Sequence, residues 1–130
     1  MSHLSIIQGF FSGDSLQIER DVTGVITTDA LIKAWFTVKT VPTIADPGSL
    51  QKIITTAAVP DVGQITEDGS ELQGNGTATV VFQLTAAETA TLGYTTQYVW
   101  DIQVKTASGK VYTPHKGTIR LLQGVTDATS

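Results

Sequence analysis

The chain has 130 residues, a formal net charge of −4 and no Cys. The lack of Cys excludes disulfides, thiolate metal sites and a Cys nucleophile. The negative charge disfavours nucleic-acid binding, which needs Lys and Arg to neutralise phosphates. With no basic leader followed by an apolar run, and no window near the about 20 apolar residues of a spanning helix, we expect a soluble protein made without export or membrane contact.

Residues 6–11 hold four large apolar side chains, Ile6, Ile7, Phe10 and Phe11. Such a run does not suit a free tail, because burying apolar surface is favourable. We therefore expect residues 1–12 to form either a first strand of the fold or an arm that adds to a neighbouring subunit. Both interpretations make these four residues candidates for a protein interface.

Alternation of apolar and polar residues predicts most of the chain to be β-strand. Thr, Val and Ile, which suit a pleated sheet, make up about a third of the sequence. The predicted strands cover residues 15–21, 31–40, 51–56, 76–84, 96–106, 111–113 and 118–125. We expect residues 57–75, rich in Pro, Gly and acids, to form a long loop, and residues 114–117 to form a turn.

The segment Thr85-Ala86-Ala87-Glu88 interrupts the strand pattern. It has the form of a capping box, in which the Thr hydroxyl and the Glu carboxylate bind free amides of a first helical turn. We expect a short helix over residues 86–92. Gly93 suits the left-handed conformation that ends such a helix.

Strands separated by short turns, with no recurring helix between them, indicate an all-β antiparallel sandwich or barrel. We favour an immunoglobulin-like sandwich that forms one domain over residues 1–130, with a polar tail at 127–130. The core is expected to include Phe36, Phe82, Tyr98, Trp100 and Ile102.

The segment 31–40 gives the clearest candidate binding residue. Alternation places Ile32 with the apolar face, but it places Trp35 on the polar face together with Lys33 and Lys39. One interpretation is that Trp35 anchors a protein–protein contact, since Trp is enriched among energetic hot spots. Two alternatives stay open for the outward Trp: the strand is covered on both faces, or a bulge shifts its register.

The sequence offers no catalytic set. Its two His residues, His3 in the terminus and His115 in the predicted turn, are expected to be solvated. The sequence contains neither a Gly-x-Ser-x-Gly elbow, a phosphate-binding loop nor a His-Glu-x-x-His pattern. We therefore expect a protein that is not an enzyme and binds no cofactor.

Four acidic residues fall within or near the predicted 57–75 loop: Asp61, Glu67, Asp68 and Glu71. Carboxylates are the hard oxygen ligands that Ca²⁺ prefers, but their spacing matches no calcium loop. We expect them to be solvated, and we predict no metal site.

Several short motifs occur in a characteristic order, ending with Val125-Thr126. They are Gly13-Asp14-Ser15-Leu16, Leu84-Thr85-Ala86-Ala87-Glu88-Thr89, Trp100-Asp101-Ile102-Gln103-Val104, Gly109-Lys110-Val111-Tyr112-Thr113 and Gly117-Thr118-Ile119. Over about residues 13–126 this order resembles small structural proteins of tailed bacteriophages. In particular, it is similar to the immunoglobulin-like N-terminal domain of upper-baseplate proteins and its single-domain relatives.

The resemblance implies a non-catalytic virion component: a tail or baseplate adaptor, a fibre-attachment module or a capsid decoration. Its partners would be other virion proteins and copies of itself in a homo-oligomer, assembled in the cytoplasm of the bacterial host. The sequence departs from the baseplate relatives because no long fibre-forming extension follows the domain. The alternative is a carbohydrate-binding or host-surface adhesion module, with Trp35 and Tyr94 as its platform.

Overall fold

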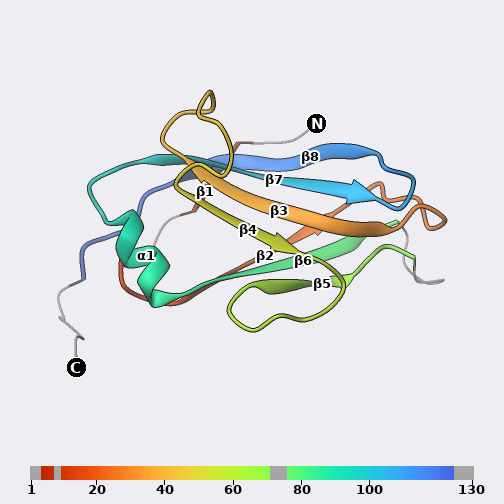
Figure 1. Ribbon diagram of the computed structural model, residues 1–130, viewed down its shortest axis with the longest axis horizontal. Helices are drawn as coiled ribbons and strands as arrows, with labels where there is room; N and C mark the ends of the chain where they lie inside the picture. The colour runs from red at the N-terminus through yellow and green to blue at the C-terminus, as the bar shows by residue number, and fades with distance from the viewer. Residues whose placement is uncertain (1–3, 8–9, 71–75, 125–130) are drawn as a thin grey trace.

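The computed structural model describes residues 4–7, 10–70 and 76–124, with only the backbone for 4–7 (Figure 1). Two sheets lie face to face, with strand orders β1-β8-β7-β3-β4 and β2-β6-β5. The elements are β1 (Leu4–Ile7), β2 (Leu16–Val22), β3 (Leu31–Lys39), β4 (Leu50–Ile54), β5 (Gly63–Glu67), β6 (Ala78–Leu84), α1 (Ala86–Leu92), β7 (Tyr98–Thr106) and β8 (Val111–Ile119).

The fold is an all-β sandwich of the predicted kind. In one sheet, β4 is added beside β3 and β1 beside β8 to the three central strands β3, β7 and β8, and β2, β6 and β5 form the other sheet. This order is similar to that of variable-type immunoglobulin domains, which also extend their three-stranded sheet beyond the strand equivalent to β3. All strand pairs are antiparallel except β1, which runs parallel to β8.

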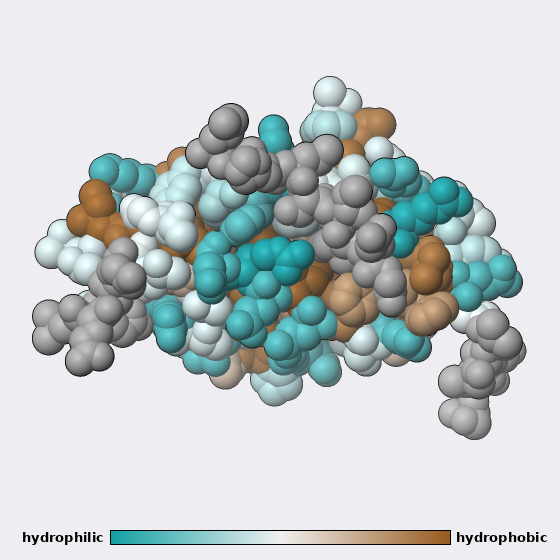
Figure 2. All heavy atoms as spheres, turned by 180° about the vertical axis from the view of Figure 1, so that it is seen from behind, coloured by the Kyte–Doolittle hydropathy of each residue, from teal (hydrophilic) through white to brown (hydrophobic). Residues whose placement is uncertain are grey.

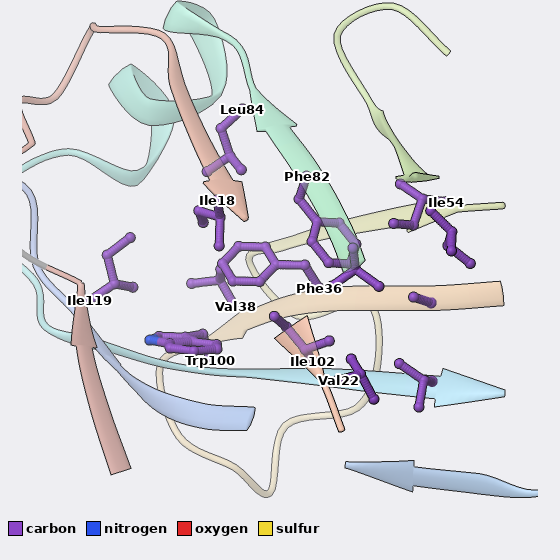
Figure 3. Close-up of a cluster of buried hydrophobic side chains, with 14 of the residues drawn as sticks. Ile18, Val22, Phe36, Val38, Ile54, Phe82, Leu84, Trp100, Ile102 and Ile119 are labelled. Atoms are coloured by element: carbon purple, nitrogen blue, oxygen red, sulfur yellow. The ribbon is translucent and has the colours of Figure 1, made fainter. Parts of the chain in front are cut away.

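The core lies between the sheets and centres on three aromatic rings (Figure 3). The ring of Phe36 on β3 lies 5.6 Å from that of Phe82 in the opposite sheet and 5.7 Å from that of Trp100 on β7. The indole of Trp100 donates a hydrogen bond to the carbonyl of Thr118 at 3.0 Å. Ile102 is fully buried beside them. These contacts bury large apolar area from both sheets at once, which is the main stabilising contribution in a fold of this kind.

Tyr98, also expected in the core, is only partly buried, and it connects two elements through its hydroxyl. Its hydroxyl donates to the carbonyl of Leu92 at 2.8 Å, tying the start of β7 to the end of α1. The same arrangement, a Tyr near the start of the equivalent strand bonded to backbone a few residues upstream, occurs in immunoglobulin domains. The helix itself spans the predicted residues, with both hydrogen bonds of the capping box between Thr85 and Glu88 and with φ +73° at Gly93.

A partly buried ion pair joins α1 to the five-stranded sheet. Lys52 on β4 is 7% exposed, and its ammonium lies 2.6 Å from a carboxylate oxygen of Glu88 and donates to the carbonyl of Asp61 at 2.8 Å. Burial alone would raise the pKa of Glu88, but the hydrogen bond and charge of Lys52, together with the bonds from Thr85, lower it. The ion pair therefore fixes α1 to β4, and the bond from Lys52 to Asp61 ties β4 to the segment just before β5 of the other sheet.

The expected 57–75 loop is wrong over residues 63–67, which form β5. Gly63, interpreted as a loop residue, has φ +131°, and a Cβ there would lie 2.0 Å from the carbonyl oxygen of Val81. The glycine permits close approach of β5 to β6, as glycines within strands often do. Residues 71–75 of the expected loop lie outside the described part.

The expected turn at 114–117 and the final strand at 118–125 are also wrong. β8 runs without interruption to Ile119, and residues 120–124 form no strand. Between the pairs Ile102–His115 and Val104–Tyr112, β8 carries one residue more than β7. Pro114 lies in this bulge, where a missing N–H does not break the ladder.

The prediction that Ile32 points into the core is also wrong. The pairing of β3 with β7 shifts between Leu31 and Lys33, so that Ile32 is the extra residue of a bulge. Ile32 is therefore 45% exposed, and Leu31 takes the buried position.

The N-terminal segment forms a strand of the same chain. The backbone of β1 pairs with residues 116–119 of β8, as the first of the two interpretations expects. The side chains of Ile6 and Ile7, and the polar tail at 127–130, lie outside the described part.

Two neighbouring aromatic residues on opposite faces of β3 provide the first prediction. Phe36→Ala removes the ring that contacts both sheets and should lower the free energy of unfolding by about 3–5 kcal/mol. Trp35→Ala should lower it by less than about 1 kcal/mol. Urea denaturation followed by circular dichroism measures both. Equal losses would contradict the assignment of Phe36 to the core and Trp35 to the outer face.

The ion pair between Lys52 and Glu88 provides the second prediction. Glu88→Gln leaves the buried ammonium of Lys52 without its counter-charge and should cost about 1–3 kcal/mol at neutral pH. Because the pKa of Glu88 is lower in the folded state, this contribution is present above the unfolded pKa and lost as pH falls through the folded pKa. Glu67→Gln, at an exposed position, is the matched control. Thermal melts between neutral and acid pH should show a difference only for Glu88→Gln, shrinking on acidification.

Candidate functional site

The outer face of the five-stranded sheet carries a groove. Register places Gln51, Thr37, Asp101 and Lys116 in one row across β4, β3, β7 and β8. Side chains alternate between the two faces of a strand, so these residues point outward where Phe36 and Trp100 point inward.

Trp35 stands in the neighbouring row, opposite Gln103. The ammonium of Lys33 lies 5.3 Å from the centroid of its indole ring. Lys33 does not line the groove, whereas Trp35 and Lys39 do. One side of the indole is thus in contact with a cation and the ring forms a wall of the groove.

The loop between β3 and β4, residues 40–49, contributes Pro42 and Asp46 to the lining of the groove. Lys39 holds this loop through an ion pair of 2.9 Å with Asp46. Gly48 lies close to the sheet at φ +66°, and a Cβ there would lie 2.5 Å from a carbon of the Lys39 side chain. The cavity so formed has a volume of about 580 Å³, within the range of small-molecule sites.

Asp101 is the most unusual group in the groove. Burial raises the pKa of its carboxyl, the charge of Lys39 opposes this shift, and the charge of Asp46 adds to it. Within residues 10–70 and 76–124, its carboxylate has neither a hydrogen bond nor an ion pair shorter than 4.0 Å. A half-buried carboxylate with free acceptor oxygens is a candidate for binding a ligand.

Of the two alternatives to a contact role for Trp35, the structure rules out the shifted register. The bulge in β3 lies at Ile32, and Trp35 and its neighbours pair regularly with β7, so a shifted register does not explain the outward Trp. The second sheet packs on the other face of β3. Trp35 remains partly exposed between the groove and Lys33.

The other predicted interface residues lie elsewhere. Phe10 and Phe11 are 39% and 40% exposed, next to Leu122, which is 46% exposed. The backbones of these segments are bonded: Leu122 N–H donates to the Phe10 carbonyl and Ser12 N–H to the Leu122 carbonyl, both at 2.9 Å. We call Phe10, Phe11 and Leu122 the terminal apolar cluster. Tyr94 is exposed after α1 and does not line the groove, so it forms no platform with Trp35 there.

The histidines and acids considered from sequence form no common site in the described segments. His115 lies in β8, where its Nε2 is 2.7 Å from the Asp21 carbonyl oxygen, and His3 lies outside the described part. Asp68 accepts hydrogen bonds from Ser70, which lower its pKa.

The remaining acids are separate from one another. Asp61 lies before β5, Glu67 ends that strand, and Glu71 falls outside the described residues. Among the residues whose placement is given, no three His, Asp or Glu side chains gather as a metal site.

Sequence reasoning missed most of the groove. Alternation did place Asp101 and Gln103 on the face opposite Trp100, but alternation does not show which strands are neighbours. Gln51 and Lys116 reach the groove only through the pairing of β4 and β8. No sequence signal marks the 40–49 loop as its wall.

Comparison with known proteins assigns the chain to no family. No family model and no curated protein matches it. A family 123 glycoside hydrolase from Clostridium perfringens is similar in structure, with a TM-score of 0.43 and 10% sequence identity. The match covers 94% of this chain but 23% of the hydrolase, so the chain spans about a quarter of that protein. In the described residues, no helix is long and apolar enough to span a bilayer.

The environment of Asp101 provides the third prediction. Because burial raises the pKa of Asp101, the folded state binds its proton more tightly than the unfolded state, and stability falls as pH rises through the interval between the ordinary value of 3.8 and the folded pKa. Asp101→Asn should therefore raise the melting temperature at neutral pH, and the gain should vanish below the ordinary pKa. Asp14→Asn, at an exposed position, is the control and should leave the melting temperature unchanged at both neutral and acid pH. A lower melting temperature for Asp101→Asn at neutral pH would contradict this account.

Proposed function

We propose that this chain is a non-catalytic structural component of a tailed-bacteriophage particle and acts through protein–protein contacts. The order of short motifs along residues 13–126 supports the proposal, as does the immunoglobulin-like sandwich with a helix over residues 86–92. The role would be that of a tail or baseplate adaptor, a fibre-attachment module or a capsid decoration, located in the virion.

The terminal apolar cluster is the observation that carries the proposal. Figure 2 shows hydrophobic atoms reaching the surface toward both ends of the molecule, between hydrophilic patches. In the cluster, two Phe side chains and Leu122 are exposed although their backbones are fixed by hydrogen bonds to each other. Large apolar side chains held in place at the surface lose little entropy on binding and gain by burial in a partner.

The location of the cluster favours contacts between copies. Phe10 follows β1, the outermost strand of its sheet, and Leu122 follows β8, the strand with which β1 pairs. An outermost strand presents unpaired backbone groups that another chain can bind. Apolar side chains beside such an edge give a surface suited to a homo-oligomer and to neighbouring virion proteins.

The fourth prediction concerns self-association. Light scattering on a concentration series should show an oligomer for the wild type and a monomer for the Phe10→Ser/Phe11→Ser double variant. The control is Ile26→Ser/Val111→Ser, which removes two apolar side chains that are 54% and 51% exposed outside the cluster. A wild type that stays monomeric, or a control that dissociates as readily, would contradict the role of the cluster.

The particle role itself is tested on virions. In washed particles of the phage whose genome encodes this chain, quantitative mass spectrometry should find it in a fixed ratio to the major structural proteins. Its absence from the particles would overturn the proposed function, whatever the state of association of the purified protein.

A further inference from the structure

We propose that the groove on the outer face of the five-stranded sheet binds an uncharged saccharide, with one sugar ring against Trp35 and its hydroxyls bonded to Asp101 and the neighbouring carboxamides. This site goes beyond the structural role proposed above and does not depend on it. Four properties of the groove support it: the balance of its charges, its hydrogen-bonding groups, its aromatic wall and the pairing of the backbone beneath it.

The charges that line the groove balance. Two ammonium groups, Lys39 and Lys116, accompany two carboxylates, Asp46 and Asp101. Lys39 and Asp46 already neutralise each other at 2.9 Å. An anionic or cationic ligand would gain little from such a lining, whereas a neutral polar ligand meets no opposing charge.

The polar groups of the groove are mainly hydrogen-bond acceptors, so they favour a ligand with many hydrogen-bond donors. The ionised carboxylate of Asp101 only accepts hydrogen bonds, and no described residue donates to it. Gln51 donates to the hydroxyl of Thr37 at 3.1 Å, which leaves its own carbonyl oxygen as another acceptor. Gln103 adds a third carbonyl oxygen and an amide donor. Adjacent hydroxyls of a sugar can donate to such acceptors while accepting from the amide.

The aromatic wall suits a sugar ring. The indole of Trp35 lines the groove, and Lys33, which lies over this ring, does not. Pro42 and Val99 add apolar surface to the same cavity. An apolar wall with a few fixed polar groups is the usual composition of a small-molecule site, and a sugar presents both a C–H face and a hydroxyl edge.

An extended peptide fits this place less well. Peptides that add to a sheet use unpaired backbone groups at its edge. The groove lies over β3 and β7, and both strands are paired on each side within the sheet. Their N–H and C=O groups are therefore already used, and recognition must come from side chains.

The experiment is a saturation-transfer NMR screen of the full chain against neutral sugars: glucose, galactose, mannose, rhamnose, N-acetylglucosamine and their common disaccharides. Sugars that bind are then titrated by isothermal titration calorimetry, which measures affinity equally well in a variant that lacks Trp35. The variants are Trp35→Ala and Asp101→Asn, both expected to stay folded, which thermal melts verify. Tyr94→Ala removes an exposed aromatic ring outside the groove and is the matched control.

We expect at least one sugar to bind the wild type and the Tyr94→Ala variant alike, and both groove variants to bind it at least tenfold more weakly. No binding by any sugar in the panel at millimolar concentration would overturn the proposal. Binding that survives both groove substitutions would overturn it too, since the sugar would then lie elsewhere. Neither result depends on the oligomeric state or on incorporation into particles, so failure here is distinguishable from failure of the proposed structural role.

Discussion

The contact of Phe36 with Phe82 and Trp100 is the constraint on which the rest of the structure depends. It anchors β3 and β7 to the second sheet by their inward side chains. Because successive residues of a strand alternate between faces, burying Phe36 and Trp100 also directs Trp35 and Asp101 outward. A one-residue slip in either strand would bury the polar set and expose the core, so packing energy protects the geometry of the groove.

The sandwich joins its sheets without a disulfide, and polar contacts at one end reinforce the aromatic core. Glu88 both completes the capping box of α1 and pairs with Lys52 on β4 of the five-stranded sheet. Tyr98 bonds the far end of the same helix to β7. The helix thus acts as a connector whose two ends are fixed to different strands. Removing one charge of a buried pair usually costs more than the pair contributes, because the remaining charge stays buried.

Local signals were enough to predict the helix, since Thr85 and Glu88 lie within one turn and need no distant partner. Alternation likewise predicted the long strands and the burial of Phe36, Trp100 and Ile102, but it placed Ile32 in the core, where a bulge turns that residue outward. It failed where tertiary context changes the meaning of a residue: Pro114 lies in a bulge within a strand, and Gly63 in a strand that approaches its neighbour closely. The groove could not be predicted, because pairing of distant strands brings Asp101 together with its neighbours.

The two candidate surfaces lie toward the same end of the sandwich. Lys39 and Val99, which line the groove, are paired, and the next residue, Tyr98, pairs with Ile119 shortly before the terminal apolar cluster. Under the two proposals, copies that associate through the cluster would present their grooves near one another. Weak binding of a single sugar is then multiplied on a polysaccharide, since each further contact forms at high effective concentration. A modest affinity of each single site is therefore compatible with firm attachment of the whole assembly. The half-buried Asp101 lowers the stability of the fold, and such a loss of stability is common where a residue serves binding.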